Sequence, residues 1–142
     1  MPFLFLVGCA SVQRDALLEK HQWHALSIET TYFPIQGFIS NNIDATRPLT
    51  VMIEGDGYAW ITRTVPSSNP TPTKSVALNI VLTQPNAAYL GRPCQYRQAA
   101  HCTPYYWTLG RFDTNILQSM GEALDALKKQ SGATPVSYTH LT

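Results

Sequence analysis

The sequence has 142 residues, which is enough for one domain with a real hydrophobic core. Its charged fraction is 13% and its net charge is +1, with Lys and Arg scattered along the chain, so nothing resembles the basic surface of a nucleic-acid-binding protein. No apolar stretch approaches the length that spans a bilayer, and ten prolines indicate long ordered loops.

The chain opens with an apolar segment that ends in the string LVGC, at Cys9. This string resembles the lipobox of bacterial lipoproteins, in which a diacylglyceryl group is attached to the cysteine thiol and the preceding peptide is removed. The resemblance implies a lipoprotein-signal-like segment at residues 1–9, a lipid anchor on Cys9 and a location in the bacterial cell envelope. Only eight residues precede Cys9 and none is Lys or Arg, which indicates a misplaced start codon or an upstream truncation. The alternative is a core strand or helix with a buried cysteine.

Residues 10–21 are polar and predict a linker, or a short helix that leaves the anchor. Alternating apolar and polar residues with many β-branched and aromatic side chains then predict an antiparallel pair of strands at 23–31 and 34–40. The run LTVMIEGDG predicts a strand at 49–54 that is buried on both faces.

A Pro- and Ser/Thr-rich segment at 61–74 predicts an extended loop. A helix is expected at 75–84, and a second buried strand at 87–91. The strongest helix is predicted at 113–132, with Asp113 as its N-cap and Gly132 after its last turn. Its apolar face is made by residues at steps of three and four: Ile116, Leu117, Met120, Ala123, Leu124 and Leu127.

Two cysteines lie close together in the string RPCQYRQAAHC. If the chain is exported, Cys94 and Cys102 lie in an oxidising compartment, and we expect a disulfide between them. His101 beside Cys102 suggests a zinc site as an alternative, but the CxxC spacing that supports such a site is absent, so no metal is expected.

The order of strands and helices predicts an α/β fold, because buried strands that alternate with helices form parallel sheets. The expected domain covers residues 22–135. The last residues, 136–142, can be reverse-translated into a DNA sequence that matches a transposon-end adapter used in sequencing libraries. They are interpreted as adapter read-through, with a short β-strand as the alternative, so the natural gene is expected to continue past Ala133.

An antiparallel strand pair followed by a strand that ends in EGDG, a helix, a strand and a helix resembles the N-terminal half of an α/β-hydrolase sheet. The strings IEGDGYAWITRTVPSSNPTP, NAAYLGRPCQY and CTPYYWTLGRF resemble a group of uncharacterised bacterial lipoprotein-type members of that superfamily. The resemblance covers roughly residues 22–133. It implies that the strand at 49–54 lies between the strand at 87–91 and a missing fifth strand. One edge is then left unpaired, and we expect the chain to aggregate or to remain partly unfolded.

In this superfamily the loop after the third strand often begins with His-Gly, and one of its backbone N–H groups forms part of the oxyanion hole. Glu54 stands at the position of the histidine, so the resemblance makes Asp56, or else Gly57, the N–H donor. Glycine permits the backbone geometry that exposes such N–H groups. A structural turn without a catalytic role and a phosphate-binding loop are the alternatives. Tyr58 and Trp60 either line a substrate pocket or cover the sheet edge.

The superfamily carries its nucleophile on a G-x-S-x-G turn after the fifth strand, and its acid and histidine come later. The sequence has no such motif. We therefore expect an inactive fragment of a serine hydrolase that acts on small esters or related acyl compounds, without a cofactor or nucleic-acid partner, and held to the membrane through Cys9. The alternatives are a non-catalytic envelope lipoprotein or binding module with the same fold, and a small secreted domain complete in itself.

Overall fold

The computed structural model describes residues 8–133 and the backbone of residues 136–140. The apolar segment before Gly8 and the last two residues of the adapter-like tail lie outside the described residues.

The described chain forms a small α/β fold around a mixed sheet with the strand order β1-β2-β4-β3-β5. Neighbours β1–β2 and β2–β4 are antiparallel, and β3 runs parallel to both β4 and β5. The predicted antiparallel pair and the two buried strands are therefore confirmed, within a few residues at their ends. The strands are β1 (Trp23–Ile28), β2 (Ile35–Ser40), β3 (Leu49–Ile53), β4 (Ala87–Leu90) and β5 (Val136–His140).

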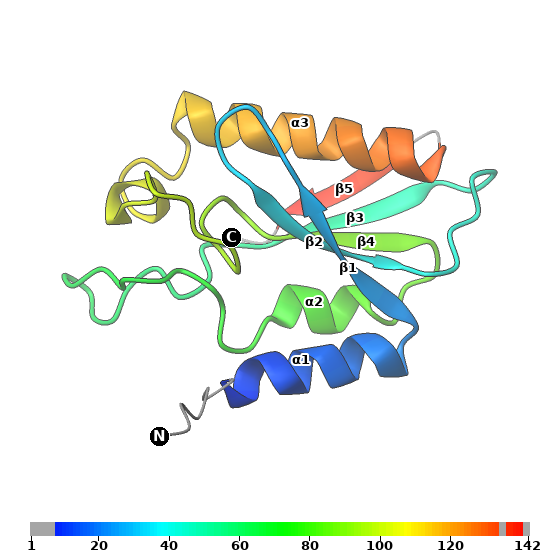
Figure 1. The fold of residues 1–142 in the computed structure, drawn as a ribbon, viewed down its shortest axis with the longest axis horizontal. Coiled ribbons are helices and arrows are strands. Elements are labelled where there is room, and N and C mark those ends of the chain that lie inside the picture. The colour runs from blue at the N-terminus through cyan, green and yellow to red at the C-terminus, as the bar shows by residue number, and fades with distance from the viewer. Residues whose placement is uncertain (1–7, 134–135, 141–142) are drawn as a thin grey trace, which may run out of the picture.

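Helices cover both faces of the sheet, as Figure 1 shows: α3 lies on one face, and α1 and α2 lie on the other. The predicted helices at 75–84 and 113–132 are present but shorter, and a short 3-10 helix, η1, lies in the aromatic loop. The helices are α1 (Cys9–Lys20), α2 (Val76–Val81), η1 (Pro104–Trp107) and α3 (Thr114–Ser131).

The segment 10–21, predicted as a linker or a short helix, forms the packed helix α1, so the helix alternative is confirmed. Leu18 is buried in the core on this side of the sheet, and Arg14 lies over the ring of Phe38. Cys9 begins the helix and is exposed, so the alternative of a buried cysteine is wrong. None of the helices in the described part of the chain combines the length and apolar character needed to cross a membrane.

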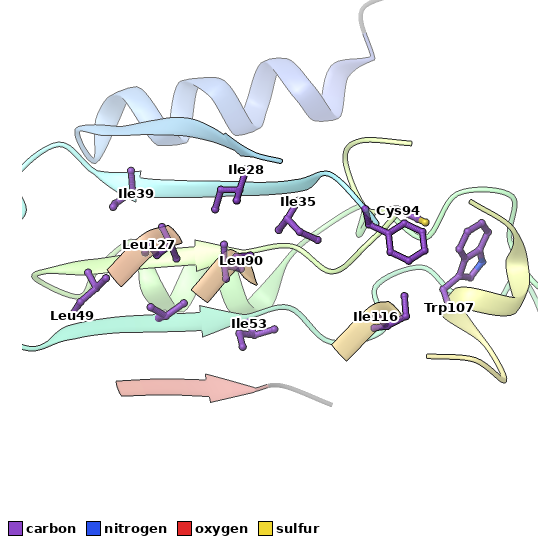
Figure 2. Packing of buried hydrophobic residues seen from close by; sticks show 14 of the residues in the cluster. Ile28, Ile35, Ile39, Leu49, Ile53, Leu90, Cys94, Trp107, Ile116 and Leu127 are labelled. Carbon is purple, nitrogen blue, oxygen red and sulfur yellow. The ribbon is translucent and has the colours of Figure 1, made fainter. Parts of the chain in front are cut away.

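The alternating side chains of the central strands divide the core into two layers. Leu49, Val51 and Ile53 of β3 belong to the same core cluster as Ile116 and Leu127 of α3, and Figure 2 labels four of these residues. Met52 packs on the side of α1 and α2. Strand β4 is buried along its whole length, as predicted for a strand covered on both faces.

The predicted caps of helix α3 are confirmed. Asp113 accepts a 2.9 Å hydrogen bond from Asn115 N–H, and Gly132 has a left-handed backbone. Its predicted apolar face is wrong at Leu117, which is 56% exposed. Ser119 is buried instead, and its hydroxyl oxygen accepts the N–H of Phe33 at 3.2 Å. The spacing of apolar residues along a helix cannot predict a polar residue that is buried because it bonds to a neighbouring loop.

The unpaired edge expected at β3 is occupied. Residues Val136–His140 form β5, which pairs with β3 in parallel over the whole length of that strand, from Leu49 opposite Val136 to Ile53 opposite His140. The short-strand alternative for the tail therefore describes its conformation in this chain, while the adapter interpretation concerns its origin and remains a prediction.

Candidate functional site

The turn 54–57 leaves the carboxyl end of β3, beside the end of the parallel strand β4. Glu54 N–H donates to the carbonyl of Leu90 at 2.9 Å, which joins the two strand ends. Gly57, and not Gly55, has a left-handed backbone, with φ +64°. A Cβ on Gly57 would lie 2.2 Å from the carbonyl oxygen of Pro70, so this position needs glycine for its conformation and for its space.

Glu54 is buried, with 6% of its surface exposed, and its carboxylate is fully engaged. One oxygen accepts Gly55 N–H at 2.9 Å. The other accepts the Tyr89 hydroxyl at 2.6 Å and the hydroxyl of Ser75. Ser75 also caps α2, since its oxygen accepts Leu78 N–H at 2.9 Å, so this carboxylate ties the turn to α2 and β4.

Two tyrosines extend this network into the protein. The hydroxyls of Tyr89 and Tyr96 are 2.9 Å apart. Burial, followed by the neighbouring Tyr96 and Glu54, raises the pKa of Tyr89 well above its usual range. Burial also raises the pKa of Tyr96 to about 12. Both hydroxyls therefore stay protonated at neutral pH and can donate hydrogen bonds.

The side chain of Asp56 is held by two arginines. Arg92 Nη1 lies 3.3 Å from one carboxylate oxygen, and Arg111 Nη1 lies 2.8 Å from the other. Burial lowers the pKa of Arg92, while the charge of Asp56 opposes this shift. Both guanidinium groups also lie against the ring of Phe112, at 5.4 and 5.2 Å from its centroid. The carboxylate of Asp56 is thus neutralised beside the turn.

The predicted disulfide between Cys94 and Cys102 is present, with a Cα–Cα distance of 5.8 Å. It closes a loop that supports the turn: Gln95 Nε2 donates to the carbonyl of Gly55 at 3.0 Å. Cys94 and Tyr96 have φ values of 71° and 62°, a conformation that non-glycine residues adopt only when their surroundings impose it. The disulfide loop therefore supports the turn from behind its backbone, through the bond between Gln95 and the carbonyl of Gly55.

The zinc alternative for the two cysteines is wrong, because their sulfurs are joined to each other. His101 Nε2 donates instead to the carbonyl of Tyr32 at 2.7 Å, and its ring packs against Tyr32 and Phe33. Among the described residues, no group of three His, Cys, Asp or Glu side chains could hold a metal ion.

Two backbone N–H groups of the turn have no hydrogen-bond acceptor in the described part of the chain. Within residues 8–133, the N–H groups of Asp56 and Gly57 donate to no acceptor. Asp56 and Gly57 line an open pocket with a volume of about 340 Å³. Its lining includes Glu54, Asp56, Gly57, Tyr58, Thr73 and Lys74.

Of the two aromatic residues predicted for this site, Tyr58 lines the pocket and Trp60 does not. Both side chains are exposed. Trp60 pairs with Pro66 across the loop that follows the turn. That loop is anchored by Trp107, whose indole N–H donates to the carbonyl of Ser67 at 3.1 Å.

The residues described here do not include a serine nucleophile with its base. Ser67 bonds the carbonyls of its own loop, and Ser75 bonds Glu54 and α2. His24 lies against Asn41 and His101 against Tyr32, and across residues 8–133 no serine is hydrogen-bonded to a histidine.

The sequence did not reveal the partners of the two acids. Arg92, a partner of Asp56, directly follows the predicted strand at 87–91, so its place at the sheet edge could have been found from topology. Arg111 and Tyr89 gave no such signal, since an arginine in an aromatic loop and a tyrosine in an apolar strand are explained by ordinary packing.

Comparisons with known proteins show little similarity. No protein-family model matches the chain, and no curated protein sequence matches it. Among solved structures, oligopeptidase B from Leishmania major is similar at 11% sequence identity and a TM-score of 0.46. The match covers 84% of this chain and 16% of that chain, so this protein spans a small part of the length of the structure it matches. A similarity this distant assigns no function.

Proposed function

We propose that residues 22–133 are the N-terminal part of an α/β-hydrolase domain, and that the complete protein is a serine hydrolase for ester or related acyl bonds. In this proposal Asp56 N–H, with Gly57 N–H as the second candidate, binds the oxygen that becomes negative during acyl transfer. A preorganised donor of this kind lowers the barrier by about 3–4 kcal/mol.

One observation carries the proposal: the backbone N–H groups of the neighbouring residues Asp56 and Gly57 have no acceptor within residues 8–133, and both residues line an open pocket. They follow β3 at the carboxyl end of parallel strands, which is where ligands bind in open α/β sheets. The parallel pairing of β3 with β4 also supports the proposal, since the superfamily order places the strand at 49–54 beside the strand at 87–91.

Two acids beside an oxyanion site are an objection to this chemistry, because a nearby negative charge repels a developing anion. The contacts of both acids weaken that objection. Glu54 accepts hydrogen bonds from Tyr89, Ser75 and Gly55, and Asp56 is paired with two arginines. The charge of Asp56 is therefore compensated before a substrate binds, and the charge of Glu54 is stabilised by hydrogen bonds from neutral donors.

The nucleophile is expected on a G-x-S-x-G turn encoded after Ala133, with the acid and histidine later in the gene. The 142-residue chain should be inactive by itself, because the motif is absent from it. The complete protein would require no cofactor, would act on small esters or acyl compounds, and would be held at the bacterial envelope by a lipid on Cys9.

The test is to recover the genomic locus and read it across the codon of Ala133. We expect a G-x-S-x-G sequence shortly after it, and a fluorophosphonate probe should label the extended protein at that serine. The serine-to-alanine variant and the 142-residue chain are matched controls and should stay unlabelled. A locus without such a serine contradicts the proposal, as does an extended protein that folds but is not labelled.

A non-catalytic binding module with the same fold is the second candidate. The observation that favours it is Glu54, which occupies the position of the superfamily's histidine as a buried, fully bonded carboxylate. A folded, unlabelled extended protein is the result expected from this candidate.

A further inference from the structure

The loop that follows the turn ends in a tip with exposed apolar side chains. Trp60 pairs with Pro66 in an antiparallel bridge, so these residues close a short hairpin, the 60–66 hairpin. Ile61 N–H donates to the carbonyl of Val65 at 2.8 Å, which places the two residues opposite each other with their side chains on one face. Trp60, Ile61 and Val65 are all exposed. Three such side chains at one tip form a cluster, unlike the single exposed apolar residues that are common on protein surfaces.

The hairpin bonds its own backbone N–H groups. Thr62 N–H donates to the carbonyl of Val65 at 3.3 Å. The hydroxyl oxygen of Thr62 accepts the N–H groups of Val65 at 3.2 Å and of Thr64 at 3.4 Å. An apolar medium holds no water that could replace such bonds, so a loop enters it at low cost only when its N–H groups are already bonded. The hairpin meets this condition at Ile61, Thr62, Thr64 and Val65.

The base of the hairpin is joined to the loop that contains η1. Ser67 N–H donates to the carbonyl of Ala59 at 2.9 Å, which closes the base. The indole N–H of Trp107 donates to the carbonyl of Ser67 at 3.1 Å, which links the two loops. Figure 1 shows the hairpin and η1 at the same end of the molecule, at the left of the view.

The loop after η1 has an apolar tip of its own. Leu109 is 89% exposed, and Phe112 is exposed as well. Two guanidinium groups lie against the ring of Phe112 and hold it in this position. A leucine with most of its surface in water gains little from the core, so packing does not explain Leu109.

The part of the chain that forms both tips has no acidic residue. All nine Asp and Glu residues of the sequence lie outside residues 57–112, whereas five of the ten Lys and Arg residues lie inside. Arg63 is exposed in the hairpin and forms no ion pair within residues 8–133. Asp56, the acid nearest to the hairpin in the sequence, is held by two arginines. The tips therefore combine apolar side chains with positive charge.

We propose that the 60–66 hairpin, together with Leu109 and Phe112, inserts into the surface of a membrane that contains anionic lipids. Binding of this kind grows with the apolar area that is buried and with the attraction between cations and anionic headgroups. Trp60 suits the boundary between headgroups and acyl chains, where indole rings are enriched. Arg63 supplies the attraction to the headgroups.

This contact depends neither on hydrolase activity nor on the lipid proposed for Cys9. Helix α1, which begins at Cys9, starts toward the same end of the molecule in Figure 1, so a lipid there and the two tips can reach one membrane. A second copy of the chain and a later part of the protein are the other surfaces that could cover the tips. Neither explains why the hairpin bonds its own N–H groups, since a protein surface can supply acceptors.

Vesicle sedimentation tests the proposal with the Cys9→Ser form of the 142-residue chain, which cannot carry a lipid on that residue. We expect binding to vesicles made of equal parts phosphatidylcholine and phosphatidylglycerol, and much weaker binding to phosphatidylcholine alone. Ile61→Ser should remain folded by circular dichroism and weaken binding about tenfold, because less apolar area leaves water. Leu117→Ser is the matched control and should leave binding unchanged, since Leu117 has the same exposed fraction, 56%, but lies on α3.

A second pair of variants tests the charge. Arg63→Gln should weaken binding to the anionic vesicles about fivefold, which is the contribution of one cation near such a surface. Lys129→Gln removes the same charge from the last turn of α3, at the opposite end of the molecule in Figure 1, and should leave binding unchanged.

Tryptophan fluorescence distinguishes insertion from adhesion. Of the three tryptophans, Trp23 and Trp107 are buried and Trp60 is exposed, so a blue shift on adding anionic vesicles reports on Trp60. Trp60→Phe should abolish the shift and keep most of the sedimentation. Sedimentation of the original chain without a shift would contradict insertion.

Other results would overturn the proposal outright. One is the absence of sedimentation with anionic vesicles, and another is an equal loss of binding in the Ile61→Ser and Leu117→Ser variants. A dimer that Ile61→Ser dissociates and that does not bind vesicles would assign the tips to a contact between copies. An extended protein, read from the genomic locus, that no longer sediments would show that a later part of the chain covers them.

Discussion

The hydroxyl of Tyr89 donates a 2.6 Å hydrogen bond to the carboxylate of Glu54, and this bond joins the ends of the parallel strands β3 and β4. Glu54 begins the turn that carries the candidate oxyanion donors, and Tyr89 lies in the most buried strand. The stability of the site should therefore depend on the carboxylate of Glu54.

Replacing Glu54 by alanine should lower the free energy of unfolding by about 3 kcal/mol, because two buried hydroxyl donors lose their acceptor. Urea denaturation followed by circular dichroism measures this. Glu29→Ala is the matched control, since Glu29 is an exposed partner of Arg97, and it should cost less than about 1 kcal/mol. Equal costs for the two variants would show that Glu54 has no special structural role.

Gly57→Ala should destabilise the chain by more than about 2 kcal/mol. A left-handed alanine costs about 1–2 kcal/mol, and its Cβ would also collide with the backbone of Pro70. Gly121→Ala is the control, because a Cβ there meets nothing within 4 Å and should stabilise α3 by about 0.5–1 kcal/mol. Thermal unfolding of both variants tests the pair, and a neutral Gly57→Ala would contradict the geometry described for the turn.

Loss of the disulfide should loosen the turn 54–57 as well as the loop that the disulfide closes. The double change Cys94→Ala and Cys102→Ala should cost about 2–3 kcal/mol from loop closure alone. It should also speed hydrogen exchange at Gly55 and Tyr58, because the loop that holds Gln95 against Gly55 is released. Cys9→Ser should change neither quantity, since Cys9 is exposed. Unchanged exchange at the turn would mean that the loop holds its shape without the bond.

The raised pKa values of the buried tyrosines predict a loss of stability at alkaline pH. The folded chain keeps Tyr96 protonated up to about pH 12, whereas the unfolded chain loses that proton near pH 10. This contribution is therefore complete below pH 10 and declines between pH 10 and 12. Tyr96→Phe should reduce the decline, and Tyr58→Phe, at an exposed position, should not. The free energy of unfolding of all three chains is measured by denaturation between pH 10 and 12. The same decline in all three would contradict a contribution from Tyr96.

A chain that ends at Ala133 should associate. Its β3 would lose β5 and leave a row of unpaired N–H and C=O groups along an apolar edge. Light scattering against the 142-residue chain measures the effect. Thr139→Pro in the longer chain should reproduce part of it, because proline cannot donate to the strand ladder at the position opposite Met52. If the shortened chain and the Thr139→Pro variant are both monomeric and unfold cooperatively, the edge of β3 does not need a paired strand.

The elements of this fold were predictable from short segments because their signals are local. Ser75 and Asp113 bond to N–H groups two or three residues ahead, and both caps were found where they were expected. Tertiary contacts overrode the local pattern at α1, where a polar segment packs through Leu18 and Arg14. They also overrode it at Ser119, which is buried because Phe33 needs its hydroxyl.

The sequence by itself determined the order of strands and helices from β1 to α3, the pairing of Cys94 with Cys102, and the position of the glycine turn after β3. Only the tertiary structure decided that Glu54 meets Tyr89 and that Asp56 lies between Arg92 and Arg111. The physical reason is separation along the chain. Periodicity and caps act between neighbours, whereas the partners of a buried charge are chosen by the packing of distant segments, which no local pattern records.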